Sequence, residues 1–482
     1  MASFYVEQFG CRATQADGAA IEQQLRQRGC VAASDVGSAD VVVVNTCTVT
    51  AAADSQARDA IRRIHARNPA ACVIVTGCYA QRAPEELAAI LGVSWVVGNS
   101  HKPQIPYIFD AVSSQKAPLA AAGFVPIRSL DRSLASDGAG NALSLDRGPA
   151  KIITGDIFQQ TSLLSAPVFA QNAGSEGHHT RPILKIQDGC DSRCSYCVIP
   201  FVRGKSRSLP PAQVVAEIQR LSDSGYREVV LSGINLGMYG RDLAPRVEFD
   251  DLLRRIIDET SIQRLRISSI EPMDVTRDLI ALLASSDRFA EHFHMPLQSG
   301  SDRILAAMHR WYRAEHYARR VDLIREHLPH AAIGADVIAG FPGETPEDHA
   351  IALSFIERLP LTYLHVFSFS TRPGTRAASR SDHLAAGVIH ARARELRALG
   401  EQKSAEFYCS QIGRSLPVLT LRRTAHVDSA APPTWTPAIS SNYLHVRLAG
   451  EWPPNRMISG QLRSGGARYL NAQPETATAF AV

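Results

Sequence analysis

The stretch Gly189-Cys190-Asp191-Ser192-Arg193-Cys194-Ser195-Tyr196-Cys197 sets three cysteines at the spacing C-x3-C-x2-C, directly after the apolar segment Ile183 to Gln187. Thiolates crowded together in this way are typical metal ligands. A cubane iron-sulfur cluster takes four ligands, so a loop with three cysteines leaves one iron open to a ligand that is not a protein side chain. The stretch therefore predicts an iron-sulfur site with one open iron.

Structural zinc is the alternative for this loop. Zinc favours paired C-x2-C or C-x4-C knuckles and needs a fourth ligand nearby. The nearest histidines, His178 and His179, precede the predicted strand in a polar stretch, where they are poorly placed to complete a tetrahedron. The spacing consequently favours the iron-sulfur cluster over zinc or a purely structural group of cysteines.

The same spacing, with the aromatic Tyr196 directly before the last cysteine, resembles the radical S-adenosylmethionine (SAM) family. The resemblance implies that the open iron binds the amino and carboxylate groups of SAM. An electron from the reduced cluster would then split the sulfonium and yield a 5′-deoxyadenosyl radical. It also implies that Tyr196 lies beside the cofactor and that an electron donor such as flavodoxin or ferredoxin serves the enzyme.

The size and composition of the chain describe an ordinary globular protein with several domains. Its 482 residues exceed what one hydrophobic core usually supports, so we expect two or three domains. Hydrophobic residues make up 45% and charged residues 20%. No apolar run reaches the length of a membrane span, and the residues from Met1 to Tyr5 do not look like a signal peptide, so we expect a cytoplasmic protein without a membrane partner.

The cysteines and the net charge limit the possible partners. Nine cysteines without a secretory signal indicate reduced thiols and metal binding rather than disulfides. A formal net charge of +4 over this length permits a nucleic-acid partner but does not demand one.

Residues 1–112 alternate short apolar runs with polar, helix-like segments, which predicts an open parallel α/β sheet domain. The predicted strands are 4–9, 41–44, 72–76 and 94–97, and the predicted helices are 14–28, 53–67 and 84–91.

Three cysteines of this domain, Cys11, Cys47 and Cys78, each follow the end of a predicted strand. Open α/β sheets place their ligands at the carboxyl edge, so the topology is expected to bring the three sulfurs together. The alternative is three unrelated loop cysteines. Cys30 and Cys72 lie at the other ends of elements and are expected to be small buried residues.

A sheet domain with three such cysteines ahead of a radical SAM domain looks like the methylthiotransferase family. The matching stretches are Gly10-Cys11, Asn45-Thr46-Cys47-Thr48-Val49 and Thr76-Gly77-Cys78-Tyr79-Ala80-Gln81. The resemblance implies that Cys11, Cys47 and Cys78 hold a second, auxiliary [4Fe-4S] cluster, also with an open iron, besides the [4Fe-4S] cluster on Cys190, Cys194 and Cys197.

Residues 113–175 are rich in alanine, serine and glycine without a sustained period, which indicates a linker or an elaborated loop. Within it, 152–158 is expected to contribute one strand or a packing contact. We assign no chemistry to this segment.

Residues 176–405 resume the alternation at a larger scale and predict a partial (β/α)6 barrel as the radical SAM core. Fewer units than the eight of a full barrel leave an open side for a large substrate. The predicted strands are 183–186, 229–231, 265–267, 293–297, 333–338 and 364–369, and the predicted helices include 212–221, 249–257, 304–308 and 346–357.

The ends of these strands carry the candidate cofactor-binding residues, because such barrels gather their active groups at the strand carboxyl ends. Resemblance to the family places Gly233, Asn235, Glu271 and Asp336 near SAM, although each short string could also serve as ordinary turn and capping chemistry. His294, beside apolar neighbours, is more often a satisfied buried residue than an acid or base. The basic run from Arg203 to Arg207 is interpreted as a solvated turn or as a phosphate contact at the mouth of the site.

Residues 408–472 show short apolar runs at 416–421, 443–448 and 457–462 after a predicted helix over 394–407, which indicates a small β-barrel. From residue 411 onward seven arginines outnumber three acids, so this region carries the excess of +4. The pattern suits looped RNA and resembles the TRAM domain, most clearly over 441–446. A structural cap without an RNA role is the alternative. The arginines are Arg414, Arg422, Arg423, Arg447, Arg456, Arg463 and Arg468.

Together these features resemble a tRNA methylthiotransferase. The stretches 9–15 and 185–190 look most like the branch that inserts a methylthio group at C2 of N6-threonylcarbamoyladenosine beside the anticodon. The branches acting on isopentenyladenosine in tRNA or on a ribosomal-protein aspartate are alternatives. A non-catalytic iron-sulfur protein that binds RNA or passes electrons is the alternative from another class.

Overall fold

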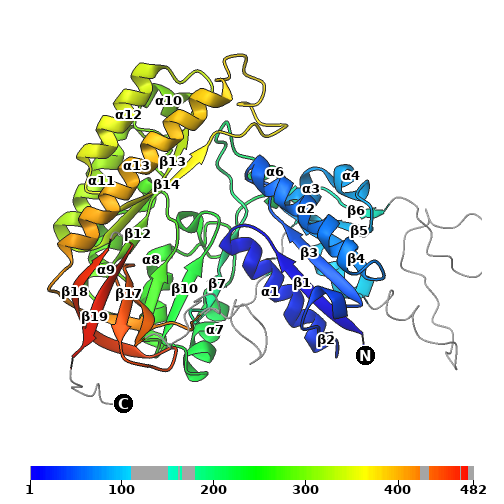
Figure 1. The fold of residues 1–482 in the computed structure, drawn as a ribbon, viewed down its shortest axis with the longest axis horizontal. Helices are drawn as coiled ribbons and strands as arrows, with labels where there is room; N and C mark the ends of the chain where they lie inside the picture. The colour runs from blue at the N-terminus through cyan, green and yellow to red at the C-terminus, as the bar shows by residue number, and fades with distance from the viewer. Residues whose placement is uncertain are drawn as a thin grey trace, which may run out of the picture.

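The computed structural model describes residues 2–109, 150–160, 163–164, 180–423, 434–466 and 468–475. Most of the predicted linker, together with His178, His179 and residues 424–433, lies outside the described residues. Figure 1 shows an N-terminal sheet domain in blue beside a strand and helix domain in green to yellow, with a small red barrel at the C-terminal end. No helix in the described part of the chain is long and apolar enough to cross a membrane.

The N-terminal domain is a six-stranded, all-parallel sheet with the order β2-β1-β3-β4-β5-β6. The four predicted strands and three predicted helices are confirmed within a few residues, and the 152–158 segment contributes the edge strand β6. The strands are Ser3–Gln8 (β1), Val31–Ala32 (β2), Val41–Thr46 (β3), Cys72–Gly77 (β4), Val93–Gly98 (β5) and Lys151–Ile153 (β6). The helices are Arg12–Gln27 (α1), Ala51–Arg67 (α2), Cys78–Arg82 (α3) and Pro84–Ala88 (α4), and the 3-10 turn Asn99–Gln104 (η2) follows β5.

The central domain is the predicted partial barrel of six parallel strands. Two three-stranded sheets, β7-β10-β11 and β12-β13-β14, are joined by single parallel bridges, including Ser269 to His294. Its strands are Ile183–Lys185 (β7), Glu228–Ser232 (β10), Arg264–Ile267 (β11), His292–His294 (β12), Ala332–Ala339 (β13) and Tyr363–Ser368 (β14). Its covering helices are Pro211–Asp223 (α7), Phe249–Glu259 (α8), Arg277–Ala284 (α9), Asp302–Ala307 (α10), Ala314–His327 (α11) and Pro346–Arg358 (α12).

One predicted strand of the barrel is too long. The run 293–297 was expected to be extended throughout, but β12 ends at His294. The chain then bends so that the amides of Leu297 and Gln298 both donate to the Asp336 carbonyl, and Gln298 adopts a φ of +66°. The bend turns the end of this segment toward the mouth of the barrel.

The C-terminal domain is a closed five-stranded barrel with the order β15-β16-β17-β19-β18. It follows a helix, Ala386–Ser410 (α13), that starts earlier than the predicted 394–407. The strands are Ser415–Thr420 (β15), Trp435–Ser440 (β16), His445–Ala449 (β17), Met457–Gly466 (β18) and Tyr469–Pro474 (β19).

The C-terminal barrel docks at the amino ends of the central strands. Arg264 donates to the carbonyls of Pro417 and Ile439, and Arg266 donates to those of Ser440 and Ser441, over 3.0 to 3.2 Å. Both guanidiniums also pair with Glu228, which is fully buried. The C-terminal barrel therefore lies at the edge of the central domain opposite to the carboxyl ends of the central strands and the cysteine loop.

The loop before β17 plugs the centre of the partial barrel from this edge. Tyr443, with a φ of +68°, stacks on His292 with ring centroids 4.2 Å apart, and Asn442 donates to the His330 carbonyl. These residues belong to the stretch that most resembles a TRAM domain, so part of that stretch serves docking between domains.

The N-terminal domain lies against the concave face of the partial barrel. Alternate residues of a strand point to opposite faces, and Leu184 and Leu231 pack with the covering helices. Ile183 and Val230 consequently face inward, where they pack against Ala16 of α1. Helix α1 thus covers part of the open side of the central domain.

Candidate iron-sulfur and cofactor site

The structure brings Cys11, Cys47 and Cys78 together at the carboxyl edge of the N-terminal sheet. They follow β1, β3 and β4, three neighbouring strands. Gly10, with a φ of +98°, lets the chain next to Cys11 come close to Cys47, because a Cβ added at Gly10 would lie 2.4 Å from the Cβ of Cys47. Cys47 and Cys78 are buried, and Cys11 is exposed.

The chemistry of these three thiols fits a metal cluster. Burial, and after it the neighbouring Cys78 and Cys11, raise the pKa of Cys47 to about 12. Facing thiols that oppose one another's ionisation become thiolates together when a cation replaces their protons. Soft thiolate ligands select metals such as iron in iron-sulfur clusters.

The second triad occupies the loop after the short strand Gln187–Asp188 (β8). Burial, and then the neighbouring Cys194, raise the pKa of Cys197 to about 12. The amide of Ser192 donates to the Cys190 sulfur over 3.4 Å, and Arg310 Nη1 donates to the Cys194 sulfur over 3.3 Å. Gly189, with a φ of +74°, turns the chain into this loop where an added Cβ would overlap the Lys205 carbonyl. This donor set also fits a cluster.

One short helix, Ile199–Arg203 (α6), connects the two triads. It begins two residues after Cys197 and packs on α3, which begins with Cys78. Cys78 itself forms an apolar cluster with Val198 and Val202. The position of one triad is therefore coupled mechanically to that of the other.

A cavity of about 200 Å³ lies between the N-terminal and central domains. Tyr196 and Cys197 line it from the central domain, and Val49 and Thr50, which follow Cys47, line it from the N-terminal domain. Asp336 and residues of β14 complete the wall. One cavity is thus bounded by residues next to both groups of cysteines.

Buried ion pairs fix the domain contact beside this cavity. Asp54 of α2 accepts from Arg372 over 2.6 Å and from Arg82 over 3.2 Å. The hydroxyl of Thr48, next to Cys47, donates to the same carboxylate over 2.6 Å. The loop that carries Cys47 is consequently tied to the segment that follows β14.

The predicted cofactor-binding residues lie in different surroundings. Tyr196 and Asp336 line the cavity. Glu271 forms an ion pair with Arg310, the residue that bonds the Cys194 sulfur. Asn235 is buried after β10, and its Oδ1 has no hydrogen-bond partner among the described residues. A buried amide oxygen without a partner suits a polar ligand, and SAM supplies an amino group.

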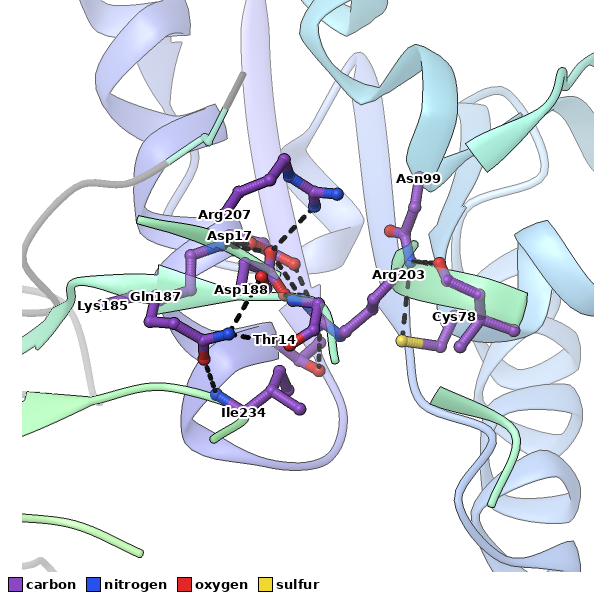
Figure 2. Close-up of polar contacts among 12 residues, drawn as sticks. Thr14, Asp17, Cys78, Asn99, Lys185, Gln187, Asp188, Arg203, Arg207 and Ile234 are labelled. Atoms are coloured by element: carbon purple, nitrogen blue, oxygen red, sulfur yellow. Dashed lines mark hydrogen bonds and ion pairs between the residues drawn. The ribbon is translucent and has the colours of Figure 1, made fainter. Parts of the chain in front are cut away.

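Gln187 organises the turn that contains Gly233 and Asn235, which motif reading did not reveal. Its Oε1 accepts the amides of Ile234 and Asn235, both over 2.9 Å, and its Nε2 donates to the Gly189 carbonyl over 2.8 Å. Figure 2 shows this side chain between the strand and the turn after β10. A Cβ at Gly233 would lie 2.9 Å from this oxygen, so the absence of a side chain there lets Gln187 bind the turn.

His294 is a bonded member of a polar cluster at the inner face of the barrel. Its Nε2 lies 2.8 Å from Asp336, and its Nδ1 lies 3.0 Å from the hydroxyl of Tyr363, which also contacts His292. Burial alone would raise the pKa of Asp336, but hydrogen bonds from His294 and His365 hold it well below its usual range. In the described part of the chain, His294, Asp336 and His365 are the one set of three metal-ligating residues whose ligand atoms lie within 4.8 Å of one another.

The basic run from Arg203 to Arg207 is not a solvated turn, and its two arginines do not reach out to phosphates. Arg203 is only 2% exposed and pairs with Asp188 and with Asp17 of α1. Arg207 is buried as well, and Lys205 alone of the three cations is exposed. The prediction of an exposed basic run was wrong because the acidic partners of these arginines lie on other elements of the chain.

These arginines belong to a buried charge network at the domain interface, shown in Figure 2. Asp17 pairs with Lys102, Lys185 and Arg203, and Asp188 pairs with Lys185, Arg203 and, at 4.0 Å, Arg207. Four cations therefore share two carboxylates, a formal excess of four minus two, or +2.

The excess positive charge lies beside the first cysteine triad. Asn99 donates both to the Cys78 sulfur over 3.5 Å and to the Val202 carbonyl over 2.7 Å, so it links the triad to α6. The pKa of Arg203 is raised well above its ordinary value because Asp188, Cys78 and Asp17 outweigh the cost of burial. A positive excess favours the ionised form of the three thiols, which is a second reason why the residues present fit an anionic cluster.

Comparison with known proteins agrees with this arrangement. Residues 184–356 match the Radical SAM superfamily, and residues 3–98 match the family described as "Uncharacterized protein family UPF0004". The central domain is thus that of a radical SAM protein.

Full-length relatives define the family more closely. The chain is 35% identical over 444 residues to the "Threonylcarbamoyladenosine tRNA methylthiotransferase MtaB" of Aquifex aeolicus, which covers 92% of this chain and 96% of the relative. It is also 35% identical over 478 residues to the protein of the same name from Bacillus subtilis, covering 98% of this chain and 96% of that relative. A "tRNA-2-methylthio-N(6)-dimethylallyladenosine synthase" of Syntrophobacter fumaroxidans is 35% identical over 382 residues, 78% of this chain and 76% of the relative. The chain belongs to the radical SAM methylthiotransferases, in the MtaB branch.

Solved structures support the fold alone. The radical S-adenosylmethionine methyltransferase TsrM of Kitasatospora setae matches with a TM-score of 0.56 at 16% identity, over 90% of this chain and 79% of that chain. The likeness extends beyond the barrel, and it carries no residue assignment.

Proposed function

We propose that this chain inserts a methylthio group at C2 of N6-threonylcarbamoyladenosine in tRNA, in place of the hydrogen on that carbon. The observation that carries the proposal is the single cavity bounded by residues next to both cysteine triads. A reaction that joins sulfur to a carbon freed of its hydrogen needs both reagents at one atom.

In the proposal each triad has its own role. Cys190, Cys194 and Cys197 hold one [4Fe-4S] cluster, and Cys11, Cys47 and Cys78 hold the other. When bound, the first supplies the electron that cleaves SAM, and the second supplies the sulfur that is transferred.

The protein's own residues position these groups and the substrate. Gln187 shapes the turn at Gly233 and Asn235 where SAM would lie, and Glu271 orients Arg310 toward Cys194. Helix α6 and the buried charge network set the separation of the two triads. The walls that the two domains provide on either side of the cavity limit access of water to reactive species.

The choice of substrate is supported by two relatives that are 35% identical and are covered to 96% of their own length, because both are named as threonylcarbamoyladenosine tRNA methylthiotransferases. Because one dimethylallyladenosine synthase reaches the same identity over a shorter span, the branch needs a direct test. We also propose a reductant such as flavodoxin or ferredoxin, a cytoplasmic location and RNA contact through the C-terminal barrel.

Mass spectrometry of tRNA nucleosides from cells that lack this protein tests the proposal. The expected result is loss of the 2-methylthio form of N6-threonylcarbamoyladenosine while N6-threonylcarbamoyladenosine itself persists. Restoring the wild-type gene should return the modification, and a Cys194→Ala gene should not. Loss of a methylthio group from dimethylallyladenosine instead would assign the other tRNA branch.

A further inference from the structure

Arg12 is a cation without a partner beside the first cysteine triad. It directly follows Cys11 and is the first residue of α1, the helix that lies on the concave face of the partial barrel. Its side chain is half-buried, and among the residues that the structure describes no carboxylate or carbonyl pairs with its guanidinium. A half-buried guanidinium without a carboxylate partner is a suitable site for an anion.

The positive charge of Arg12 affects the pKa values of residues inside the partial barrel. It contributes to lowering the pKa of His292, after burial, Arg266 and His294. It also opposes the rise in the pKa of Tyr363 that burial and Tyr443 cause. The charge of Arg12 therefore acts on residues at the inner face of the partial barrel.

The acids that face the same interior already have partners. Asp336 is bonded by His294 and His365, and Glu228 is shared by Arg264 and Arg266. None of them neutralises Arg12, so its charge remains available to a ligand.

The chemistry of the proposed substrate places an anion within reach of this residue. C2 of adenine must approach the sulfur at the cysteine triad to which Cys11 belongs, and N6 lies on the same edge of the base, separated from C2 by N1 and C6. A substituent on N6 therefore passes close to the residue that follows Cys11. The threonylcarbamoyl group ends in a free carboxylate, whereas the dimethylallyl group is a hydrocarbon.

We propose that Arg12 binds the carboxylate of the threonylcarbamoyl group and so selects this nucleoside over one with an uncharged N6 substituent. The inference rests on the proposed function and adds a specificity-determining residue to it. A guanidinium offers two parallel N–H donors to a carboxylate, and an amide in place of the carboxylate cannot accept both as an anion does.

Two synthetic anticodon stem-loop RNAs test this role. One carries N6-threonylcarbamoyladenosine, and the other carries the same nucleoside with its carboxyl group converted to a primary amide. The cluster-loaded wild-type protein should prefer the acid over the amide by about 10- to 100-fold in kcat/KM, the range expected for a hydrogen-bonded charge pair. Arg12→Gln should bring this ratio close to one by lowering activity on the acid alone, and Arg12→Lys should give an intermediate ratio.

Arg193→Gln is the matched control, because Arg193 is an exposed arginine directly before a cysteine of the other triad. It removes the same charge beside a cluster and should leave the ratio at the wild-type value. Iron content and equilibrium binding of both RNAs without SAM provide readouts that do not depend on turnover. Binding of the acid, but not of the amide, should weaken in Arg12→Gln.

The outcomes separate this inference from the proposed function. If the wild-type protein methylthiolates neither RNA, the proposed function fails. If the wild-type protein acts on the acid but Arg12→Gln keeps the wild-type ratio in both turnover and binding, the role of Arg12 is refuted. Equal losses on the acid and the amide would likewise refute it, because they would show a structural effect.

Discussion

Replacing Asp17 with asparagine should destabilise the contact between the N-terminal and central domains. Asp17 is fully buried, and Lys102, Lys185 and Arg203 overcome the cost of burial to lower its pKa from 3.8 to about 2. At 1.36 kcal/mol per unit, this shift corresponds to about 2 kcal/mol of stabilisation at neutral pH. Leaving buried cations without their partner raises the expected loss to about 3 to 5 kcal/mol.

Differential scanning calorimetry of the full chain is the appropriate assay. A protein of several domains does not unfold in two states, so the midpoint of the first transition is compared rather than a free energy. A loss of this size should lower that midpoint by roughly 5 to 15 °C. Asp59→Asn is the control, because Asp59 forms an exposed pair with Arg62 that contributes at most about 1 kcal/mol.

The pH dependence has a defined sign. Because the folded pKa of Asp17 lies below the unfolded one, its contribution is present above about pH 4 and is lost as the pH falls toward 2. The difference between wild type and Asp17→Asn should therefore shrink by about 1 kcal/mol at pH 3, which is about half of the contribution that titrates. Adding Lys102→Met to Asp17→Asn should recover part of the loss, because it removes a cation that was left unpaired. If Asp17→Asn melts no earlier than Asp59→Asn, the account of the network is wrong.

Three further changes test other parts of the structure. Gly10→Ala should lose iron from the first triad, because the new Cβ would lie 2.4 Å from the Cβ of Cys47. Gly29→Ala is the control and should keep this iron, because Gly29 also has a positive φ but no atom within 4 Å of an added Cβ. Iron analysis after anaerobic reconstitution compares the two variants. Cys47→Ala should lower bound iron to about half and abolish the methylthio product while 5′-deoxyadenosine still forms, and unchanged iron would refute the assignment of two separate sites. Glu228→Gln should lower the stability of the folded protein by about 3 to 5 kcal/mol, because two buried arginines lose their partner. Looser docking of the C-terminal barrel should appear as faster hydrogen exchange in β15 and β16, and unchanged exchange in these strands would contradict the prediction.

The strands that carry the cysteines could be predicted because their residues are apolar, β-branched and bounded by clear turns. The run at β3 is buried at every position, and β4 and β13 are similar. Because the carboxyl ends of parallel strands lie at one edge of the sheet, the topology predicted that Cys11 and Cys78 lie close together. Strand β16 gave no such signal, because Pro437 interrupts a short run that its neighbours in the barrel hold in place.

The charge network could not be predicted, because its members are far apart in the sequence. Lys185 and Asp17 are 168 positions apart and meet only when α1 lies on the concave face of the barrel. Without knowledge of the acidic partners, the local pattern of basic residues around Arg203 predicts solvent-exposed side chains. The partner-free position of Arg12 likewise depends on which groups surround it after folding, and spacing does not contain that information.

The central claim is that both triads act on one atom of one nucleoside. The direct measurement is anaerobic turnover of stem-loop RNAs by the protein loaded with both clusters, SAM and a reductant, followed by mass spectrometry of the nucleosides. The account predicts a methylthio group, with loss of the C2 hydrogen, on the RNA that carries N6-threonylcarbamoyladenosine and little or none on the dimethylallyl counterpart. Formation of 5′-deoxyadenosine without methylthio product on either RNA, under conditions in which iron analysis shows both triads filled, would contradict it.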